Sequence, residues 1–381
     1  MKLALYQPWI YLYGGLERSL LELVKRSRHE WTIYTGHYEI ENTFPEFKNF
    51  NIIELNKLSV KRDMASVFLV ALKIMTQKIN MKEYDALVVW CDGMGDMVTF
   101  RNQERPIFNI CSTPLRAVFD PAYIKQVLLE RGPVAKIAFR IFQKVFKAVD
   151  VMAWKKYNGV IATSTEVKKR IISGGLYKDE SYMNLFYPGI DWNDLHGHKE
   201  YEPFILVPGR IMWSKNIELA IKAFIKANLP EPWHLVIAGF LDEKSKVYLE
   251  KLKKISNDSK QVDFKISPSD EKLNILYSKA SVILFPPLNE DWGIVPIEAM
   301  AHSKPVLANN SGGPLESIVH NKTGWLVPPD VNRWAEIIRS FPANASLIRT
   351  MGKNARQYSN KYDWAEFVSG VDGSLEKWRK N

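Results

Sequence analysis

Two glutamates, Glu290 and Glu298, lie in a stretch that combines carboxylates with glycines at the turns between strands and helices. The stretch runs from Leu284 to Glu316 and reads LFPPLNEDWGIVPIEAMAHSKPVLANNSGGPLE. A carboxylate accepts hydrogen bonds from sugar hydroxyls, whereas a helix that begins at a glycine exposes its first backbone N–H groups to an anion. Together these groups suit a ligand that carries both phosphate and hydroxyls. The alternative for Glu298 alone is a solvated residue on a helix surface.

Two strand–loop–helix corners must position these groups. The apolar run 281–285 predicts a buried strand, and a helix is predicted to begin near Gly293. A second short strand over 305–308 leads to a glycine turn at 311–313, and the helix that follows carries Glu316. Ligands of parallel sheets bind outside the carboxyl ends of the strands, which is where both corners fall.

The start of the first of these helices is the predicted anion site. The backbone N–H groups of Gly293, Ile294 and Val295 have no partners within the helix, and the helix dipole favours negative charge there. We therefore expect this segment to contact the phosphates of a donor.

This stretch resembles the donor-binding signature of retaining glycosyltransferase family 4, whose members have the GT-B fold. The variant found here is most similar to members that transfer mannose onto lipid-linked glycans. The resemblance implies that Glu290 holds the sugar hydroxyls and Glu298 the ribose diol. Glu316 is a further candidate, and the alternative for it is a cap of its own helix. The matching residues are Glu290, Gly293, Ile294, Pro296, Glu298, Ala299, Met300, Pro305, Val306, Gly312, Gly313 and Glu316.

Two basic residues precede this stretch in the second half of the chain. Arg210 follows the predicted strand 204–208, and Lys215 lies near the start of the next helix. Both can converge on a pair of phosphates, and the resemblance implies that they hold the donor diphosphate. The alternative is two exposed basic residues without a ligand.

The composition fits a globular chain of two domains. The sequence has 381 residues, of which 46% are hydrophobic and 25% charged. The net charge of +10 indicates an anionic partner, such as nucleotide phosphates, a membrane surface or nucleic acid. No nucleic-acid-binding motif accompanies the basic clusters, so nucleic acid is not expected.

The cellular location is predicted from cysteine usage and hydropathy. Two cysteines, Cys91 and Cys111, provide neither a disulfide framework nor a metal site. The apolar runs are too short and too interrupted by charge to span a bilayer, and Met1–Tyr6 predicts a first strand rather than a signal peptide. We expect a cytoplasmic protein, with peripheral attachment to the cytoplasmic face of a membrane as an option.

The first half alternates strands and helices, which predicts a parallel sheet covered on both faces. Gly15 lies at the first strand-to-helix corner, in the turn Gly14-Gly15-Leu16-Glu17-Arg18. This turn is either a plain helix start or, as the resemblance implies, a point where the backbone approaches a diphosphate. The preceding aromatic loop, 9–13, either lines an acceptor or lipid site or tucks under the sheet edge.

A second segment of the first half departs from the family pattern. Cys111-Ser112-Thr113-Pro114-Leu115-Arg116 resembles a C-H-T-P-x-R segment whose histidine lies by the reacting centre, but serine replaces that histidine. Serine cannot act as a base near neutral pH without a partner. Ser112 and Arg116 therefore remain candidates for the acceptor site, and Asp92 and Asp96 are candidates to substitute for the histidine.

Residues 120–157 form the clearest basic region. Lysines and arginines alternate there with isoleucine, valine and phenylalanine. This pattern is typical of a basic amphipathic helix on anionic lipid, and equally of a core-packed helix with a solvated basic face.

The fold prediction is α/β, with the GT-B arrangement of two Rossmann-like domains facing each other across a cleft. The N-terminal acceptor-side domain is predicted to span 1–188 with a returning helix over 363–381, and the donor-binding domain 189–362.

The predicted activity is retaining transfer of a hexose to a lipid-linked or glycolipid acceptor, with GDP-mannose as the favoured donor. No further cofactor is expected, and no metal, since no D-x-D pair suits one. The rival predictions are a GT-B enzyme with a soluble acceptor and a catalytically silent sugar-nucleotide-binding protein. A nicotinamide enzyme is not expected, because no G-x-G-x-x-G follows the first strand.

Overall fold

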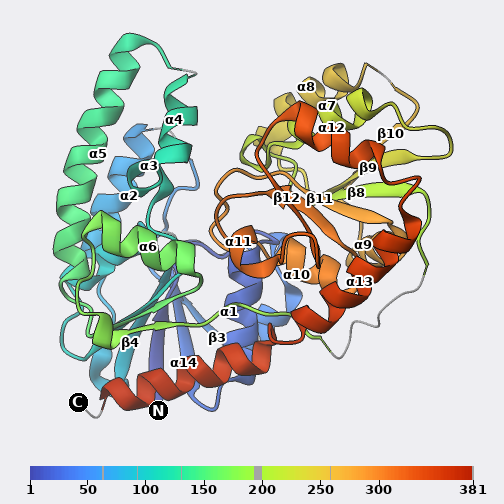
Figure 1. The fold of residues 1–381 in the computed structure, drawn as a ribbon. Helices are drawn as coiled ribbons and strands as arrows, with labels where there is room; N and C mark the ends of the chain where they lie inside the picture. The colour runs from blue at the N-terminus through green and yellow to red at the C-terminus, as the bar shows by residue number, and fades with distance from the viewer. Residues whose placement is uncertain (62–63, 92, 130, 193–199, 258, 380–381) are drawn as a thin grey trace. The chain divides into compact units, whose positions relative to one another are not determined.

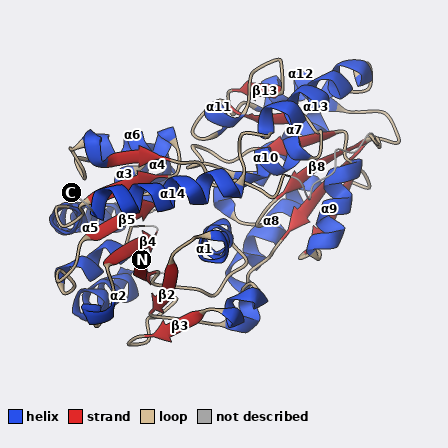
Figure 2. Ribbon diagram, turned by 90° about the horizontal axis from the view of Figure 1, so that it is seen from below, coloured by secondary structure: helices blue, strands red, loops and turns tan. Residues whose placement is uncertain are grey.

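A computed structural model describes residues 1–61, 64–91, 93–129, 131–192, 200–257 and 259–379. The chain forms two compact units, one comprising Met1–Pro188 with Trp364–Asn381 and the other Gly189–Asp363. The division after residue 188 is the predicted one, and the return to the first unit falls one residue from the predicted start of the C-terminal segment. Each unit is a parallel sheet with helices on its faces (Figures 1 and 2).

Unit 1 contains a seven-stranded parallel sheet in the order β3-β2-β1-β4-β5-β6-β7. The strand order reverses between β1 and β4, as in doubly wound sheets. Its strands are β1 Lys2–Tyr6, β2 Glu30–Thr35, β3 Asn51–Glu54, β4 Ala86–Cys91, β5 Ile107–Cys111, β6 Gly159–Ala162 and β7 Met183–Leu185. Its α-helices are α1 Gly15–Arg26, α2 Met64–Thr76, α3 Arg116–Phe119, α4 Pro121–Leu129, α5 Pro133–Trp154, α6 Thr165–Gly174 and α14 Trp364–Arg379.

The two faces of this sheet are covered by different helices. Leu87 and Val89 of β4 belong to the buried cluster that includes apolar residues of α2 and α5. Because side chains alternate along a strand, Trp90 points to the other face, where its ring lies 6.0 Å from that of Phe367 on α14. Residues buried on both faces explain why the strand reads as a continuous apolar run.

The C-terminal helix α14 is attached to unit 1 by a charged cluster beside α1. Asp372 accepts hydrogen bonds from the Ser27 hydroxyl at 2.7 Å and from the Arg28 amide at 3.0 Å. The Arg28 guanidinium donates to both carboxylate oxygens of Glu376, at 2.7 and 2.9 Å. These contacts join residues about 345 positions apart in sequence and make α14 part of the first unit.

Unit 2 contains a six-stranded parallel sheet in the order β10-β9-β8-β11-β12-β13. Its strands are β8 Phe204–Pro208, β9 His234–Gly239, β10 Val262–Ile266, β11 Val282–Phe285, β12 Val306–Asn309 and β13 Gly324–Val327. Its α-helices are α7 Ile217–Ala227, α8 Lys246–Ser256, α9 Asp270–Lys279, α10 Ile294–Ala301, α11 Pro314–Ser317, α12 Val331–Arg339 and α13 Ala345–Ser359.

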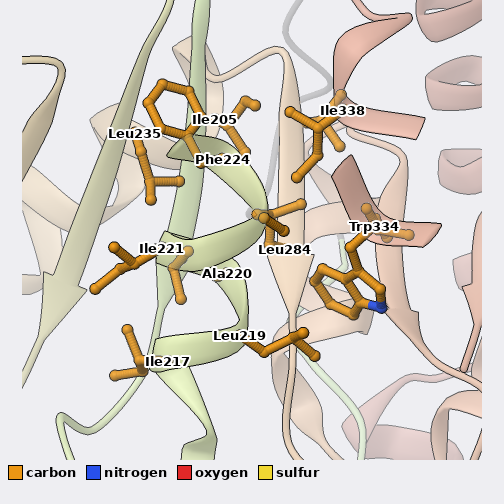
Figure 3. Packing of buried hydrophobic residues seen from close by; sticks show 14 of the residues in the cluster. Ile205, Ile217, Leu219, Ala220, Ile221, Phe224, Leu235, Leu284, Trp334 and Ile338 are labelled. Atoms are coloured by element: carbon orange, nitrogen blue, oxygen red, sulfur yellow. The ribbon is translucent and has the colours of Figure 1, made fainter. Parts of the chain in front are cut away.

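The core of unit 2 forms where α7 packs on the sheet. Ile217, Ala220, Ile221 and Phe224 recur at helical spacing and are buried. Figure 3 shows them against Ile205 and Leu284 of the strands, with Trp334 and Ile338 of α12 on the adjacent side. Burial of this face fixes the position of the α7 N-terminus. Lys215 lies two residues before it.

The strands predicted over 1–6, 204–208, 281–285 and 305–308 coincide with β1, β8, β11 and β12 to within one residue at either end. The three-residue edge strand β7 contains Asn184, so it produces no apolar run in the sequence.

A buried carboxyl pair lies within unit 1. Asp96 accepts hydrogen bonds from the Asn109 amide at 3.0 Å and from the Tyr157 hydroxyl. Asp150 of α5 is fully buried, and neither of its carboxyl oxygens has a hydrogen-bond partner in the described chain. Burial, and then the nearby charge of Asp96, raise the pKa of Asp150 well above its ordinary value of 3.8. The suggestion that Asp96 replaces the missing histidine is therefore wrong, because Asp96 is 1% exposed and occupied.

The substitution Asp150→Asn is expected to stabilise the protein at neutral pH. The folded state holds the Asp150 proton more tightly than the unfolded chain, so this residue lowers stability as pH rises above about 4. Each pKa unit of that difference costs about 1.4 kcal/mol. Thermal melts of Asp150→Asn should show a higher midpoint at neutral pH and a flatter decline from about pH 4 upward. Asp96→Ala, which removes the acceptor of Tyr157 and Asn109, should lower the midpoint instead. A lower midpoint for Asp150→Asn would show that the carboxylate is charged and stabilising.

Candidate active site

The strand order of unit 2 reverses between β8 and β11. The chain passes from β8 outward to β9 and β10, and then crosses back to β11 and β12 on the other side of β8. The loops after β8 and β11 therefore leave their carboxyl ends in opposite directions and open a crevice between them. The sequence candidates Arg210, Lys215 and Glu290 all lie on these two loops.

Lys215 and Glu290 meet at this switch point. The Lys215 ammonium donates to both carboxylate oxygens of Glu290, at 3.0 and 2.9 Å. The side chains are 23% and 16% exposed, so the pair is partly desolvated but open to a ligand. Charge-assisted contacts of this length are among the stronger hydrogen bonds in proteins. The structure thus brings together a cation and a carboxylate that are 75 residues apart.

The backbone around Glu290 is held by the glycine turn after β12. The Gly313 amide donates to the Glu290 carbonyl at 2.8 Å, and the Ser311 hydroxyl accepts from the Asn289 amide at 3.2 Å. Gly312 has a φ of +66°, and a Cβ placed there would lie 2.2 Å from the Glu290 carbonyl oxygen. Glycine is required at this position both by the backbone conformation and by the close approach.

Two asparagines hold the start of the same loop. The buried Asn309 side chain donates to the carbonyls of Pro286 and Pro287, and Asn216 donates to the Pro286 carbonyl at 3.2 Å. Asn216 itself has left-handed backbone angles, at φ 50° and ψ 39°, directly before α7. Sequence reasoning missed both residues as site components, although each lies beside a recognised motif, in SKN and NNSGG.

Arg210 follows β8 by two residues and is half-buried. Its loop is fixed on both sides, because the Gly209 amide donates to the Ala238 carbonyl at 3.0 Å and the Ile211 amide to the Phe240 carbonyl at 2.9 Å. Within the described chain, the guanidinium forms no hydrogen bond or ion pair. A fixed loop with an uncommitted guanidinium suits the capture of an anion.

The helix start predicted from the sequence is present. α10 begins at Ile294, directly after Gly293, and no side chain caps it. Gly293 has a φ of +84°, and a Cβ there would lie 2.8 Å from the ring of Phe285. Ile294 and Val295 are half-buried, and their amides belong to the first turn, where no intrahelical acceptor exists. Contact of these amides with a donor phosphate remains a prediction.

Glu298 is oriented by a buried tyrosine rather than fully solvated. One carboxylate oxygen accepts a hydrogen bond from the Tyr277 hydroxyl at 2.8 Å. The Tyr277 ring stacks on His302 at 5.3 Å, and burial together with the Glu298 charge raises the Tyr277 pKa well above its ordinary value. Tyr277 is 21 positions away on α9, and no sequence signal connects it to Glu298.

Glu316 lies on the short helix α11 and is half-buried. Its carbonyl accepts hydrogen bonds from the hydroxyls of Tyr362 at 2.9 Å and Tyr358 at 3.5 Å. These two hydrogen bonds fix the Glu316 carbonyl. A role for the Glu316 carboxylate in ligand binding remains a prediction.

The unit 1 candidates are placed at the carboxyl ends of β1 and β5. Gly15 is the first residue of α1, and a Cβ there would meet no atom within 4 Å, so its backbone is accessible. In the aromatic loop before it, Trp9 and Ile10 are buried and Tyr13 is 42% exposed. The loop thus tucks largely into the unit. Asp92 lies outside the described residues.

The Ser112 hydroxyl accepts a hydrogen bond from the Trp90 indole at 2.7 Å. The indole N–H is a donor and cannot accept the proton of the serine hydroxyl. This contact therefore does not make Ser112 a base in place of the missing histidine. Arg116 pairs with the buried Asp120 at 2.7 Å, and Asp120 also lies 3.6 Å from the buried Arg170. This pairing gives Arg116 a structural role at the start of α3 and α4.

A metal centre is not formed by any grouping of histidine, cysteine and carboxylate side chains within the described residues. Among the described helices, none is both long and apolar enough to cross a membrane.

Comparison with known proteins assigns the family. A family model described as "Glycosyl transferases group 1" matches residues 191–358, which contain all the unit 2 candidates. The alpha-1,3/1,6-mannosyltransferase ALG2 of Rhizomucor pusillus is 31% identical over 95% of this chain and 89% of its own length. The mouse protein of the same name is 40% identical over 89% of this chain and 87% of its own. The chain belongs to the ALG2 mannosyltransferase family. It is a glycosyltransferase.

Solved structures show that this glycosyltransferase has the GT-B fold. Sucrose-phosphate synthase of Thermosynechococcus elongatus matches with a TM-score of 0.78 and 20% identity over 99% of this chain and 98% of its own. Anabaena HepE, solved in complex with UDP and glucose, matches with a TM-score of 0.73 and 18% identity over 98% and 99% of the two chains. At these identities the likeness concerns the fold alone.

The substitution Gly312→Ala is expected to impair the enzyme through the Glu290 loop. A side chain there costs about 1–2 kcal/mol from the left-handed backbone and also displaces the Glu290 carbonyl. We expect a lower melting temperature and a loss of transfer rate of at least about tenfold. Gly175→Ala provides the matched control, because Gly175 has a similar φ of +71° but open space around its Cβ. If both variants lose the same stability and neither loses activity, the close approach to Glu290 is unimportant.

Proposed function

We propose that this enzyme transfers mannose from GDP-mannose to a lipid-linked glycan with retention of the anomeric configuration. The observation that carries the proposal is the Lys215–Glu290 pair at the switch point of the unit 2 sheet. It joins a group that binds phosphate to a group that binds hydroxyls, as a sugar diphosphate requires. Mannose is favoured because the relatives that match nearly the full chain are named mannosyltransferases.

Donor binding would rearrange this pair. A diphosphate that enters beside the Lys215 ammonium competes with the Glu290 carboxylate for it, and the released carboxylate can accept hydrogen bonds from sugar hydroxyls. Arg210 supplies a second cation that needs no such release. The first amides of α10 add partial positive charge near the same loop.

The same groups account for rate acceleration. Negative charge grows on the diphosphate as the bond between the anomeric carbon and the phosphate oxygen breaks. Fixed cations and amides stabilise that charge more in the transition state than in the ground state. Glu298, whose carboxylate accepts a hydrogen bond from Tyr277, would accept hydrogen bonds from the ribose hydroxyls.

The acceptor step needs no protein base in this scheme. The acceptor hydroxyl attacks the anomeric carbon from the face that the diphosphate leaves, and its proton passes to a departing phosphate oxygen. The products are GDP and the mannosylated acceptor. The serine at position 112, which is bound to Trp90, is compatible with this route, as is independence of metal and of any further cofactor.

We also infer that the enzyme works at the cytoplasmic face of a membrane as a peripheral protein. A lipid-linked acceptor resides in a bilayer, and the net charge of +10 suits an anionic surface. A soluble acceptor is the competing possibility, and transfer to a short water-soluble glycan in preference to a lipid-linked one would favour it.

Transfer assays with a panel of GDP-, UDP- and ADP-sugars test the proposal. GDP-mannose should give the highest kcat/KM, and GDP should raise the melting temperature of the enzyme more than UDP does. Glu290→Gln and Arg210→Gln should each lower kcat by about a hundredfold, corresponding to the loss of one contact to the transition state. Lys222→Gln, an exposed residue on α7, should leave kcat unchanged.

Anomeric configuration is read directly from the product by NMR. An inverted linkage, or full activity of Glu290→Gln, would contradict the assigned chemistry. Tight nucleotide binding without transfer to any acceptor would identify a silent binding protein instead.

A further inference from the structure

The long helix α5 presents three different faces. Phe139, Phe146, Asp150 and Trp154 are buried against unit 1. Successive residues of an α-helix are rotated by about 100° around its axis. By this spacing, a second set of apolar side chains lies on the side opposite to the buried residues, and this set is exposed. This set, which we call the α5 stripe, consists of Val134, Ile137, Ile141, Val145, Ala148 and Met152.

The α5 stripe is more exposed than isolated surface apolar residues need to be. Ile137, Ile141 and Val145 are 61%, 59% and 54% exposed, and the ends of the stripe, Val134 and Met152, are 81% and 56% exposed. The stripe extends for about 27 Å along the helix at 1.5 Å per residue. Because it lies opposite the buried face, no movement of α5 can bury both faces in unit 1. Contiguous apolar surface of this kind indicates an interaction site.

The charge beside the stripe specifies the partner. Lys136, Arg140, Lys144 and Lys147 form a basic band between the buried face and the stripe. The acidic residue of this helix is Asp150, which is buried, so no carboxylate on α5 offsets the band. Within the described chain, Lys136, Arg140 and Lys144 form no ion pair. An apolar band bordered by uncompensated cations matches a lipid interior bordered by anionic headgroups.

The α4–α5 hairpin carries this surface away from the sheet. Figure 1 shows α4 beside the N-terminal part of α5, with both extending beyond the strands of unit 1. No residue of α4 is fully buried, and Leu129 at its end is 74% exposed. The end of the hairpin thus presents Leu129 of α4 next to Val134, the first residue of the α5 stripe. A projecting element with an apolar end can reach a surface that the sheet itself does not touch.

We propose that the α4–α5 hairpin is the membrane-docking element of this enzyme, with the α5 stripe lying among the acyl chains and the basic band at anionic headgroups. This inference rests on the proposed lipid-linked acceptor and adds the element that brings the enzyme to it. α5 lies in the plane of the interface, since it is interrupted by cations and cannot span a bilayer. A second copy of the chain is disfavoured as the occupant, because antiparallel two-fold pairing of the stripes would place the basic bands of both copies on the same side of the contact.

Vesicle flotation of the full-length enzyme tests the proposal. Vesicles of phosphatidylcholine with about one third phosphatidylserine should bind the protein, and pure phosphatidylcholine should bind it at least about tenfold more weakly. Ile137→Gln/Ile141→Gln/Val145→Gln should weaken binding to the anionic vesicles by at least about tenfold. The matched control is Val247→Gln/Ile275→Gln/Leu347→Gln in unit 2, whose native side chains are similarly exposed at 81%, 47% and 44% and whose substitution should leave binding unchanged.

A charge variant separates the two components of docking. Arg140→Gln/Lys144→Gln should weaken binding to anionic vesicles and remove most of its dependence on salt. Lys222→Gln/Lys226→Gln on α7 changes the net charge equally and should have little effect. If both pairs weaken binding equally, attraction is due to the total charge and the hairpin has no special role.

The outcome is distinguishable from failure of the proposed function. With a water-soluble glycan acceptor and GDP-mannose, the stripe variant should keep the kcat and KM of the native enzyme, while transfer to an acceptor in vesicles falls. Loss of transfer to both acceptors together with a lower melting temperature would mean that the stripe variant misfolds. A fluorescent label on the otherwise native enzyme then tests the proposal. Ile141→Cys carrying an environment-sensitive fluorophore should shift to the blue on anionic vesicles, and Val247→Cys should not. Absence of that shift, or a dimer in light scattering that the stripe variant dissolves, would overturn the proposal.

Discussion

The contact between the Lys215 ammonium and the Glu290 carboxylate is the interaction on which the candidate active site is built. Its position follows from topology, because the chain leaves the adjacent parallel strands β8 and β11 toward opposite edges of the sheet, so the loops after them border one crevice. Its geometry follows from the glycine turn after β12, where the Gly313 amide donates to the Glu290 carbonyl, and from Asn309, which holds the start of the same loop at Pro287. The contact pairs both charges in the structure, and the proposed function requires that a bound donor replace it with new partners for each side chain.

The two units carry different kinds of groups. Unit 2 supplies fixed cations, free helix amides and oriented carboxylates at one edge of a parallel sheet, so its core packing serves mainly to hold loops. In unit 1, three of the polar residues considered for the acceptor site have partners within the unit: Asp96 accepts from Asn109 and Tyr157, Arg116 pairs with Asp120, and Ser112 accepts from Trp90. Its distinguishing feature is the apolar and basic surface of α5. Our two proposals therefore assign the chemistry to unit 2 and membrane docking to the α5 surface of unit 1.

Much of this arrangement could be predicted from the sequence, for identifiable reasons. Buried parallel strands read as apolar runs, and the residues that need glycine or charge cluster directly after them, so Arg210, Lys215, Glu290 and Gly293 could be named in advance. Contacts between distant segments could not: nothing local links Tyr277 to Glu298, or Asp150 to Asp96. The basic pattern of residues 120–157 left core packing and lipid contact open, and α5 has a core-packed face together with an exposed apolar surface on the opposite side. Alternation of apolar and basic residues indicates an amphipathic helix, but not that a second apolar face stays exposed.

A structure of the enzyme with bound GDP-mannose would test the central claim most directly. The account predicts that diphosphate oxygens lie within hydrogen-bonding distance of the Lys215 ammonium and the Arg210 guanidinium. It also predicts that the Glu290 carboxylate has left Lys215 for hydroxyls of the mannose. A donor bound elsewhere, with the Lys215–Glu290 pair intact, would contradict it.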